Sequence, residues 1–291
     1  MKFWGKFSKS IFKFAAQPRI KQLRPKLIES VLLNSTLVLD PEMITEIRSY
    51  LLSQQTPQGG FADRGGKCDL YYTLFGWYIA EAFAVKEAIE PLKKYVVKTV
   101  SDNNLTGVYR YCGAILYAKL IGPDATTEKL RLQIVKDLTY SDSSQPGYSS
   151  FLGMLALYYM EDFYNIQRII NQHKRISSSN DLPCPVVAAN AVMLGIGGTP
   201  QSEAIRVLKS FYRGKGGFAA LHQAPAEDLL STAVALYALH FLNDDIRLIK
   251  PECLTFVDDL YDNGGFRATH FDTLTDVEYT FYGLLALGSL S

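Results

Sequence analysis

The chain has 291 residues, of which 48% are hydrophobic and 20% are charged, so it can bury a core along its whole length. It contains no run of about 18 apolar residues, so no helix is expected to cross a membrane. The four cysteines show neither a Cys-x-x-Cys pair nor another metal-like spacing. This argues against a disulfide framework and favours a reducing compartment such as the cytoplasm.

The net charge of +1 conceals an uneven distribution. Residues 1–28 hold eight basic side chains and no acidic one, whereas the rest of the chain holds 22 basic and 29 acidic side chains. Phe3, Phe7 and Ile11 fall on one face at helical spacing, so residues 1–40 are predicted to be a basic amphipathic helical extension. Its aromatic face either packs on the outside of the main domain or lies on an anionic membrane surface, which would make the protein peripheral at the membrane. The acidic body argues against a nucleic-acid partner.

From residue 41 to residue 291 the chain is predicted to be a series of about six helical pairs. In each pair an amphipathic helix comes first and should lie outside, with one face in water. The second helix is apolar nearly all round and should be buried on both sides. The predicted outer helices cover residues 42–54, 89–99, 127–138, 164–173, 202–212 and 251–261. The predicted inner helices begin near residues 69, 109, 146, 183, 228 and 276. No alternating pattern long enough for a useful strand is present.

A Gly-Gly-Phe triplet occurs three times, and each copy is followed by an Asp and, four residues after it, a Thr at the start of an inner helix. The glycines permit positive φ and close approach of the chain, the Phe can pack over the end of the hairpin, and the Asp can cap the helix. Because the pattern recurs, a structural role is favoured for most of these Asp residues. Repeats of this length are typical of a solenoid or closed toroid, and six pairs predict an all-α fold, an α6/α6 toroid. The triplets begin at Gly59, Gly216 and Gly264.

These repeats resemble those of the prenyltransferase and squalene-cyclase superfamily. The resemblance lies in residues 54–83, 214–239 and 263–287, and the first segment also looks like the Gln-Trp motif of triterpene cyclases, with Phe61 in place of Trp. It implies a toroid whose inner helices line an apolar central cavity for isoprenoid chains. The expected partner is therefore a polyprenyl or other lipid-like small molecule.

Two of the superfamily's reactions depend on residues that this chain lacks. Protein prenyltransferases hold zinc through an Asp-x-Cys at one inner-helix start and a His just before the Thr of the next. Here Asp228, Leu230 and Tyr279 occupy those positions, and His222 and Pro225 stand where that family has its diphosphate-binding Arg and Lys. No Asp-x-Asp-Asp, the acid motif of triterpene cyclases, is present. We therefore expect no zinc site and no other cofactor, with Mg²⁺ entering only with a bound diphosphate.

The inner-helix starts supply the candidate site residues. If the repeats are in register, their acidic residues gather at one mouth of the toroid. Aromatic side chains in the lumen could hold a polyprene and stabilise carbocations. The alternative for the acids is helix capping, and for the aromatics it is ordinary core packing. The candidate catalytic residues are Asp69, Asp228, Asp276 and Tyr279. The candidate substrate-binding residues are Tyr72, Phe75, Trp77, Arg110, Tyr111, Phe151 and Tyr282.

Two functions follow from these expectations. The first is an isoprenoid-handling enzyme, a terpene cyclase or prenyltransferase relative with altered catalytic residues. The second is a non-catalytic toroid that binds a lipid or a protein partner. The state of the lumen separates the two hypotheses, because an open, aromatic and acid-bearing cavity favours the enzyme and a lumen filled by side chains favours the binder.

Overall fold

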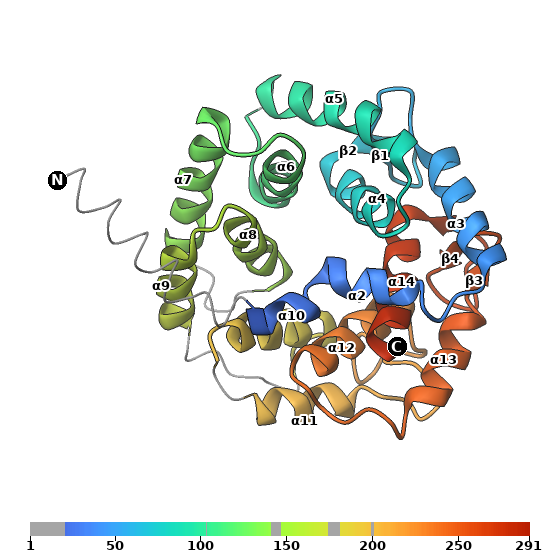
Figure 1. Cartoon of the computed structure of the whole chain (residues 1–291). Coiled ribbons are helices and arrows are strands. Elements are labelled where there is room, and N and C mark those ends of the chain that lie inside the picture. Colours follow the sequence, from blue (N-terminus) through green and yellow to red (C-terminus); the bar gives the residue numbers. More distant parts are fainter. Residues whose placement is uncertain (1–20, 103, 141–146, 174–180, 199–200) are drawn as a thin grey trace.

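The computed structural model describes residues 21–102, 104–140, 147–173, 181–198 and 201–291. Within these ranges the chain forms two concentric layers of helices (Figure 1). The outer layer consists of α3 (Pro41–Gln54), α5 (Lys86–Asp102), α7 (Ala125–Tyr140), α9 (Phe163–His173), α11 (Ser202–Ser210) and α13 (Lys250–Asp258). The inner layer consists of α4 (Leu70–Ala82), α6 (Gly107–Leu120), α8 (Tyr148–Tyr159), α10 (Cys184–Ile196), α12 (Leu229–Phe241) and α14 (Val277–Leu290).

The inner helices contact one another in chain order and then return to the start. Contacts run from α4 through α6, α8, α10 and α12 to α14, and α14 in turn contacts α4 (Figure 1). Every predicted inner helix is present and begins within two residues of its predicted start. The all-α toroid prediction is confirmed, because helices that are apolar all round lie inside and amphipathic helices lie outside.

Short strands form at the Gly-Gly-Phe turns, where the sequence analysis predicted none of useful length. β1 (Phe61–Ala62) pairs antiparallel with β2 (Cys68–Asp69). β3 (Tyr261–Asp262), β4 (Gly265–Arg267) and β5 (Thr275–Asp276) form a small antiparallel sheet. Strands of two or three residues are too short to produce an alternating pattern, so periodicity could not reveal them.

The first glycine of each triplet fits against the outer helix of the next pair. Gly59, Gly216 and Gly264 have φ of 97°, 91° and 88°, a region that side chains rarely adopt. A Cβ at these positions would lie 2.0 to 2.5 Å from a backbone carbonyl oxygen of α5, α13 or α3. In the third copy this oxygen belongs to Glu46, so the same turn geometry joins the last helical pair to the first.

The Thr of each copy ties the turn to its inner helix. The hydroxyls of Thr73, Thr232 and Thr280 accept a bond from the backbone N–H of the triplet Phe at 2.8 to 3.2 Å. Each hydroxyl also donates to the carbonyl of the preceding Asp at 2.5 to 2.7 Å. The three Phe side chains are completely buried. The predicted structural role of the triplet is therefore observed in detail.

A further helix, α2 (Ile28–Ser35), follows a short 3-10 turn, η1 (Arg24–Lys26), and packs against α14 and α4. In Figure 1 it crosses the middle of the ring of inner helices. Val31 and Leu32 are completely buried, and a Cβ on Gly288 of α14 would lie 1.8 Å from the Val31 carbonyl oxygen. The end of the predicted extension is thus part of the packed structure. Residues 1–20 and their aromatic stripe lie outside the described residues, and the boundary near residue 40 stays a prediction.

Candidate functional site

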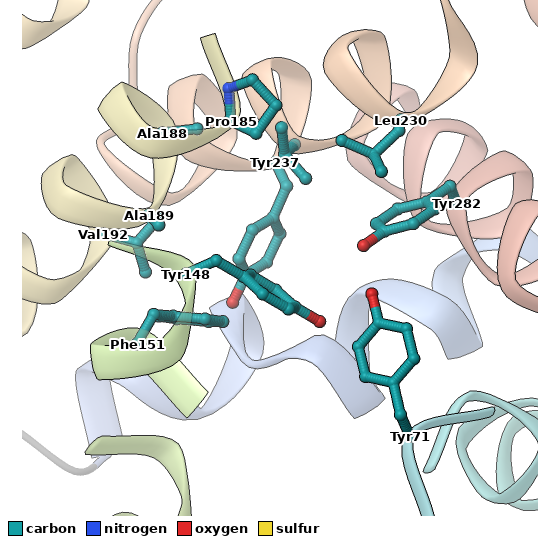
Figure 2. A pocket seen from close by; sticks show the side chains of 11 residues that line it. Tyr71, Tyr148, Phe151, Pro185, Ala188, Ala189, Val192, Leu230, Tyr237 and Tyr282 are labelled. Carbon is teal, nitrogen blue, oxygen red and sulfur yellow. The ribbon is translucent and has the colours of Figure 1, made fainter. Parts of the chain in front are cut away.

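A cavity of about 320 Å³ lies between the inner helices (Figure 2). Five of them, α4, α8, α10, α12 and α14, contribute its wall. Most of the wall is hydrocarbon: Phe151, Pro185, Ala188, Ala189, Val192, Leu230 and Val234. Its polar atoms come from the tyrosines Tyr71, Tyr148, Tyr237 and Tyr282. We call this space the central cavity.

The central cavity runs from the start of the inner helices down to α2. At its base the hydroxyl of Tyr237 donates to the carbonyl oxygen of Lys26 at 3.0 Å, directly before α2. At the other end Tyr71 and Tyr148, which stand at the first turns of α4 and α8, are partly exposed. We call this end, where the inner helices begin, the mouth.

A group of hydroxyls lies at the mouth. The hydroxyls of Tyr71, Tyr148 and Tyr282 point toward one another across the cavity in Figure 2. Tyr71 also donates to Glu278 Oε1 at 2.7 Å. Burial raises the pKa of all three phenols, so they remain neutral donors and acceptors. Burial likewise raises the pKa of the Glu278 carboxyl.

One arginine neutralises part of the acidic mouth. Arg64 forms ion pairs with Asp276 and, at 2.7 Å, with Asp272. It donates to the carbonyl of Leu274 at 3.2 Å, and its guanidinium lies 5.3 Å from the centre of the Tyr279 ring. The guanidinium is therefore already engaged by two carboxylates, a carbonyl oxygen and an aromatic ring of the protein.

The three candidate catalytic aspartates are helix caps. Asp69, Asp228 and Asp276 accept the backbone N–H three residues ahead at 2.7 to 2.8 Å. Burial raises the pKa of Asp69 and of Asp228. Tyr279 is half-buried beside these caps, and burial followed by the charge of Glu278 raises its pKa to about 12. None of the four lines the central cavity.

The candidate substrate-binding residues divide into two groups, four in or near the central cavity and three away from it. Phe151 and Tyr282 line the central cavity. Phe75 packs directly behind it, with its ring centre 4.8 Å from that of Tyr71, and Tyr72, whose pKa is raised by burial and by the charge of Glu278, stands beside Tyr71 at the start of α4.

Three other candidates lie away from the central cavity. Trp77 is buried beneath the ammonium of Lys119, which lies 5.5 Å above its ring. Arg110 pairs with Asp137 of α7. Tyr111 is buried in the core, which raises its pKa to about 12.

The candidate residues chosen from the sequence did not include Tyr71, Tyr148 or Glu278. All three stand within the first two residues of an inner helix. That position was a usable signal, because the first turns of the inner helices meet at the mouth. Which of two adjacent tyrosines, such as Tyr71 and Tyr72, faces the lumen depends on the rotation of the helix, and α4 is apolar nearly all round.

The chain matches a family model described as the prenyltransferase alpha-alpha toroid domain over residues 31–97 and 186–290. These segments make up more than half of the chain. The chain belongs to this family. The match begins inside α2 and skips residues 98–185, the region of the pairs without a Gly-Gly-Phe triplet. No curated protein matches the chain.

The zinc centre of the protein prenyltransferases in this superfamily does not fit the residues at the matching positions. The carboxylate of Asp228 accepts the N–H of Ser231 at 2.7 Å. Leu230 offers only hydrocarbon and lines the central cavity. Among the described residues, no group of three or more His, Cys, Asp and Glu side chains could hold a metal ion.

Proposed function

We propose that this protein is an isoprenoid-handling member of the prenyltransferase toroid family, and that a polyprenyl chain occupies the central cavity. The observation that carries the proposal is the wall of that cavity. It is hydrocarbon and aromatic over most of its surface, and its volume of about 320 Å³ lies near the lower end of the roughly 300–1,000 Å³ typical of ligand pockets. A wall of this kind favours a flexible apolar chain over a polar metabolite.

We further propose that the protein works without a zinc-bound thiolate. At the three positions where protein prenyltransferases have their zinc ligands, this chain has a capping Asp, a Leu and a Tyr. Of these only the Asp carboxylate is a usual zinc ligand. The four cysteines are free thiols. Burial raises the pKa of Cys112, Cys184 and Cys253, which disfavours thiolate chemistry at these three.

A matched pair of tryptophan substitutions tests the binding proposal. Val234→Trp places an indole in the central cavity, which Val234 lines. Val97→Trp makes the same change on outer helix α5, where the side chain is 37% exposed. Native mass spectrometry of the intact chain with farnesyl and geranylgeranyl alcohols and diphosphates should show binding of at least one of these ligands by the wild type and by Val97→Trp. Binding by Val234→Trp should fall at least tenfold.

Absence of binding by the wild type at ligand concentrations on the order of tens of micromolar would contradict the proposal. Equal binding by both variants would place the ligand elsewhere on the protein. An enzyme and a non-catalytic carrier share this binding step, and product analysis by gas chromatography separates them. A new product identifies an enzyme, and an unchanged chain after prolonged incubation identifies a carrier.

The basic N-terminal segment supports a second proposal, that residues 1–28 bind an anionic membrane surface. No helix in the described parts of the chain has the length and apolar character needed to span a bilayer. Lys21 and Arg24 are exposed, and Leu33 and Leu37 nearby are 56% and 78% exposed. Basic residues beside exposed apolar side chains are typical of a surface that adsorbs to anionic lipid.

Deletion of residues 1–20 tests the membrane proposal and retains every residue whose packing the structure describes. The deletion leaves Lys26 in place, whose ammonium donates to the Phe241 carbonyl at 2.8 Å. In liposome sedimentation, the full chain should pellet with vesicles that contain anionic lipid and remain in solution with neutral ones. The truncated chain should lose most of this binding, and unchanged pelleting would leave the segment with a packing role only.

A further inference from the structure

The hydroxyl cluster at the mouth has room for one more hydrogen-bonding group. The hydroxyls of Tyr148 and Tyr282 point toward that of Tyr71 across the cavity (Figure 2), and Tyr71 donates to Glu278 at 2.7 Å. A phenol has one donor and two acceptor sites, and an ionised carboxylate accepts at about four sites. The Tyr71 donor is thus engaged with Glu278, and the cluster has more acceptor sites than donors, so acceptor sites remain for a ligand. They lie where the apolar wall of the central cavity ends.

The same region has no unengaged positive charge among the described residues that line it. No Lys, Arg or His contributes to the wall of the central cavity. Arg64, at the mouth, already pairs with Asp272 and Asp276. Burial raises the pKa of Glu278, and the charge of Asp276 acts in the same direction. An anion placed here would therefore be desolvated beside carboxylates and without a counterion, which is strongly unfavourable.

We propose that the central cavity selects an isoprenoid that carries a hydroxyl group in preference to one that carries a diphosphate, and that Tyr71, Tyr148 and Glu278 bind this hydroxyl at the mouth. The inference rests on the proposed function, because it names the head group of the chain that the cavity would hold. A hydroxyl donates one hydrogen bond to a free acceptor site and accepts one from a tyrosine. A diphosphate can only accept and brings charge, so neither a prenyl diphosphate nor its Mg²⁺ belongs in this site.

Four ligands with one tail test the selectivity: farnesol, farnesyl diphosphate, farnesylamine and the hydrocarbon farnesene. Their dissociation constants for the full-length protein are measured by native mass spectrometry, with Mg²⁺ present for the diphosphate so that it binds as well as it can. Farnesol should bind at least about tenfold more tightly than the diphosphate and about fivefold more tightly than farnesene, as expected for one or two hydrogen bonds gained.

Removal of single hydroxyls tests which residues recognise the head group. Tyr148→Phe and Tyr71→Phe should bring the affinity of farnesol close to that of farnesene and leave farnesene binding unchanged. The matched control is Tyr117→Phe, because the Tyr117 hydroxyl bonds to Asp124 at 2.8 Å near the far end of α6. It should keep the wild-type preference for farnesol. Farnesene binding also reports that each variant is folded.

The outcomes separate this inference from the proposed function. If the diphosphate or the amine binds as tightly as farnesol, or if farnesene does, the hydroxyl selectivity is wrong while the polyprenyl cavity stands. If none of the four ligands binds, the tail is not held and both proposals fall. The wild-type series alone is decisive, so the inference can be tested even if a tyrosine variant does not fold.

Discussion

At the scale of single residues, the recurring Thr is the most informative position. Thr73 is completely buried, and its hydroxyl accepts from the N–H of Phe61 at 3.0 Å while donating to the Asp69 carbonyl. The sequence analysis assigned this Thr to the helix end alone. The structure shows that it also satisfies the turn, because the chain folds back through a short strand pair that periodicity did not reveal.

Thr73→Val should therefore be costly although it conserves shape. The change leaves the buried N–H of Phe61 without a partner, and we expect a loss of about 1–3 kcal/mol in the free energy of unfolding. Urea denaturation followed by circular dichroism measures it. The control is Thr45→Val on an exposed face of α3, where the hydroxyl only back-bonds to Pro41. A loss no larger than that of the control would show that the turn does not need this hydroxyl.

Glu278 should make stability depend on pH. Burial, with the charge of Asp276, raises the pKa of its carboxyl, against bonds from Tyr71 and Tyr72 and the charge of Arg64. Because the pKa is higher in the folded state, Glu278 makes its full contribution to the free energy of unfolding below the pKa that it has in the unfolded chain, near 4.3. It is lost as pH rises through the folded pKa.

Glu278→Gln keeps an acceptor for Tyr71 and does not titrate. The melting temperature of this variant relative to wild type should therefore rise between about pH 4 and pH 7. Glu203→Gln, on exposed helix α11, is the control, because a hydrogen bond from Arg206 lowers the pKa of Glu203 and no such rise is expected. A difference for Glu278→Gln that is independent of pH would contradict the assignment.

At the scale of elements, α2 packs next to the base of the central cavity. It lies across α14 and α4, and the hydroxyl of Tyr237 at the base of the cavity is bonded to the residue just ahead of its first turn. The predicted extension of residues 1–40 gave no sign that its last part would enter the core. The apolar face of α2 is short, and one of its two partners, α14, lies at the opposite end of the chain.

Gly288→Ala tests the close approach of α2 to α14. A Cβ there would lie 1.8 Å from the Val31 carbonyl oxygen, so α2 has to shift, and we expect a loss of about 1–3 kcal/mol. The control is Gly65→Ala, in an exposed turn where the nearest contact is the flexible end of Asp63 at 3.2 Å. Thermal unfolding measures both variants, and equal melting temperatures would mean that the approach is not tight in solution.

At the scale of the whole molecule, the contacts between α14 and α4 distinguish this fold from a linear array. In a linear array each repeat meets only its neighbours and unfolding can proceed piecewise. Here the turn at Gly264 packs on α3, and the rings of Phe75 and Phe281 meet across the seam with centres 4.8 Å apart. The first and last pairs therefore stabilise each other.

The chain without residues 1–20 should unfold in one cooperative step. It retains a single tryptophan, Trp77 in α4, because the other is Trp4. Trp77 fluorescence then reports on the first inner helix, and far-ultraviolet circular dichroism reports on all helices. The two urea transitions should coincide, as two-state unfolding requires. A fluorescence midpoint clearly different from the dichroism midpoint would indicate independent unfolding of the first repeats.

The sequence by itself determined the layers, the number of helical pairs and the family resemblance. These features rest on local properties: the spacing of apolar residues, the capping Asp and the turn glycines recur along the chain and need no distant partner to be recognised. Phe151 and Tyr282, which the sequence offered as substrate-binding candidates because they are aromatics on inner helices, line the central cavity, and their role in binding stays a prediction.

Only the tertiary structure decided which side chains face the lumen and what closes it. On helices that are apolar all round, the sequence contains no signal for rotation about the helix axis, so Tyr71 could not be preferred to Tyr72. The hydroxyl cluster brings together α4, α8 and α14 (Figure 2), and α2, from the start of the chain, packs beside the base of the cavity. Such contacts between segments more than 200 residues apart depend on how the helices pack together, which no local pattern specifies.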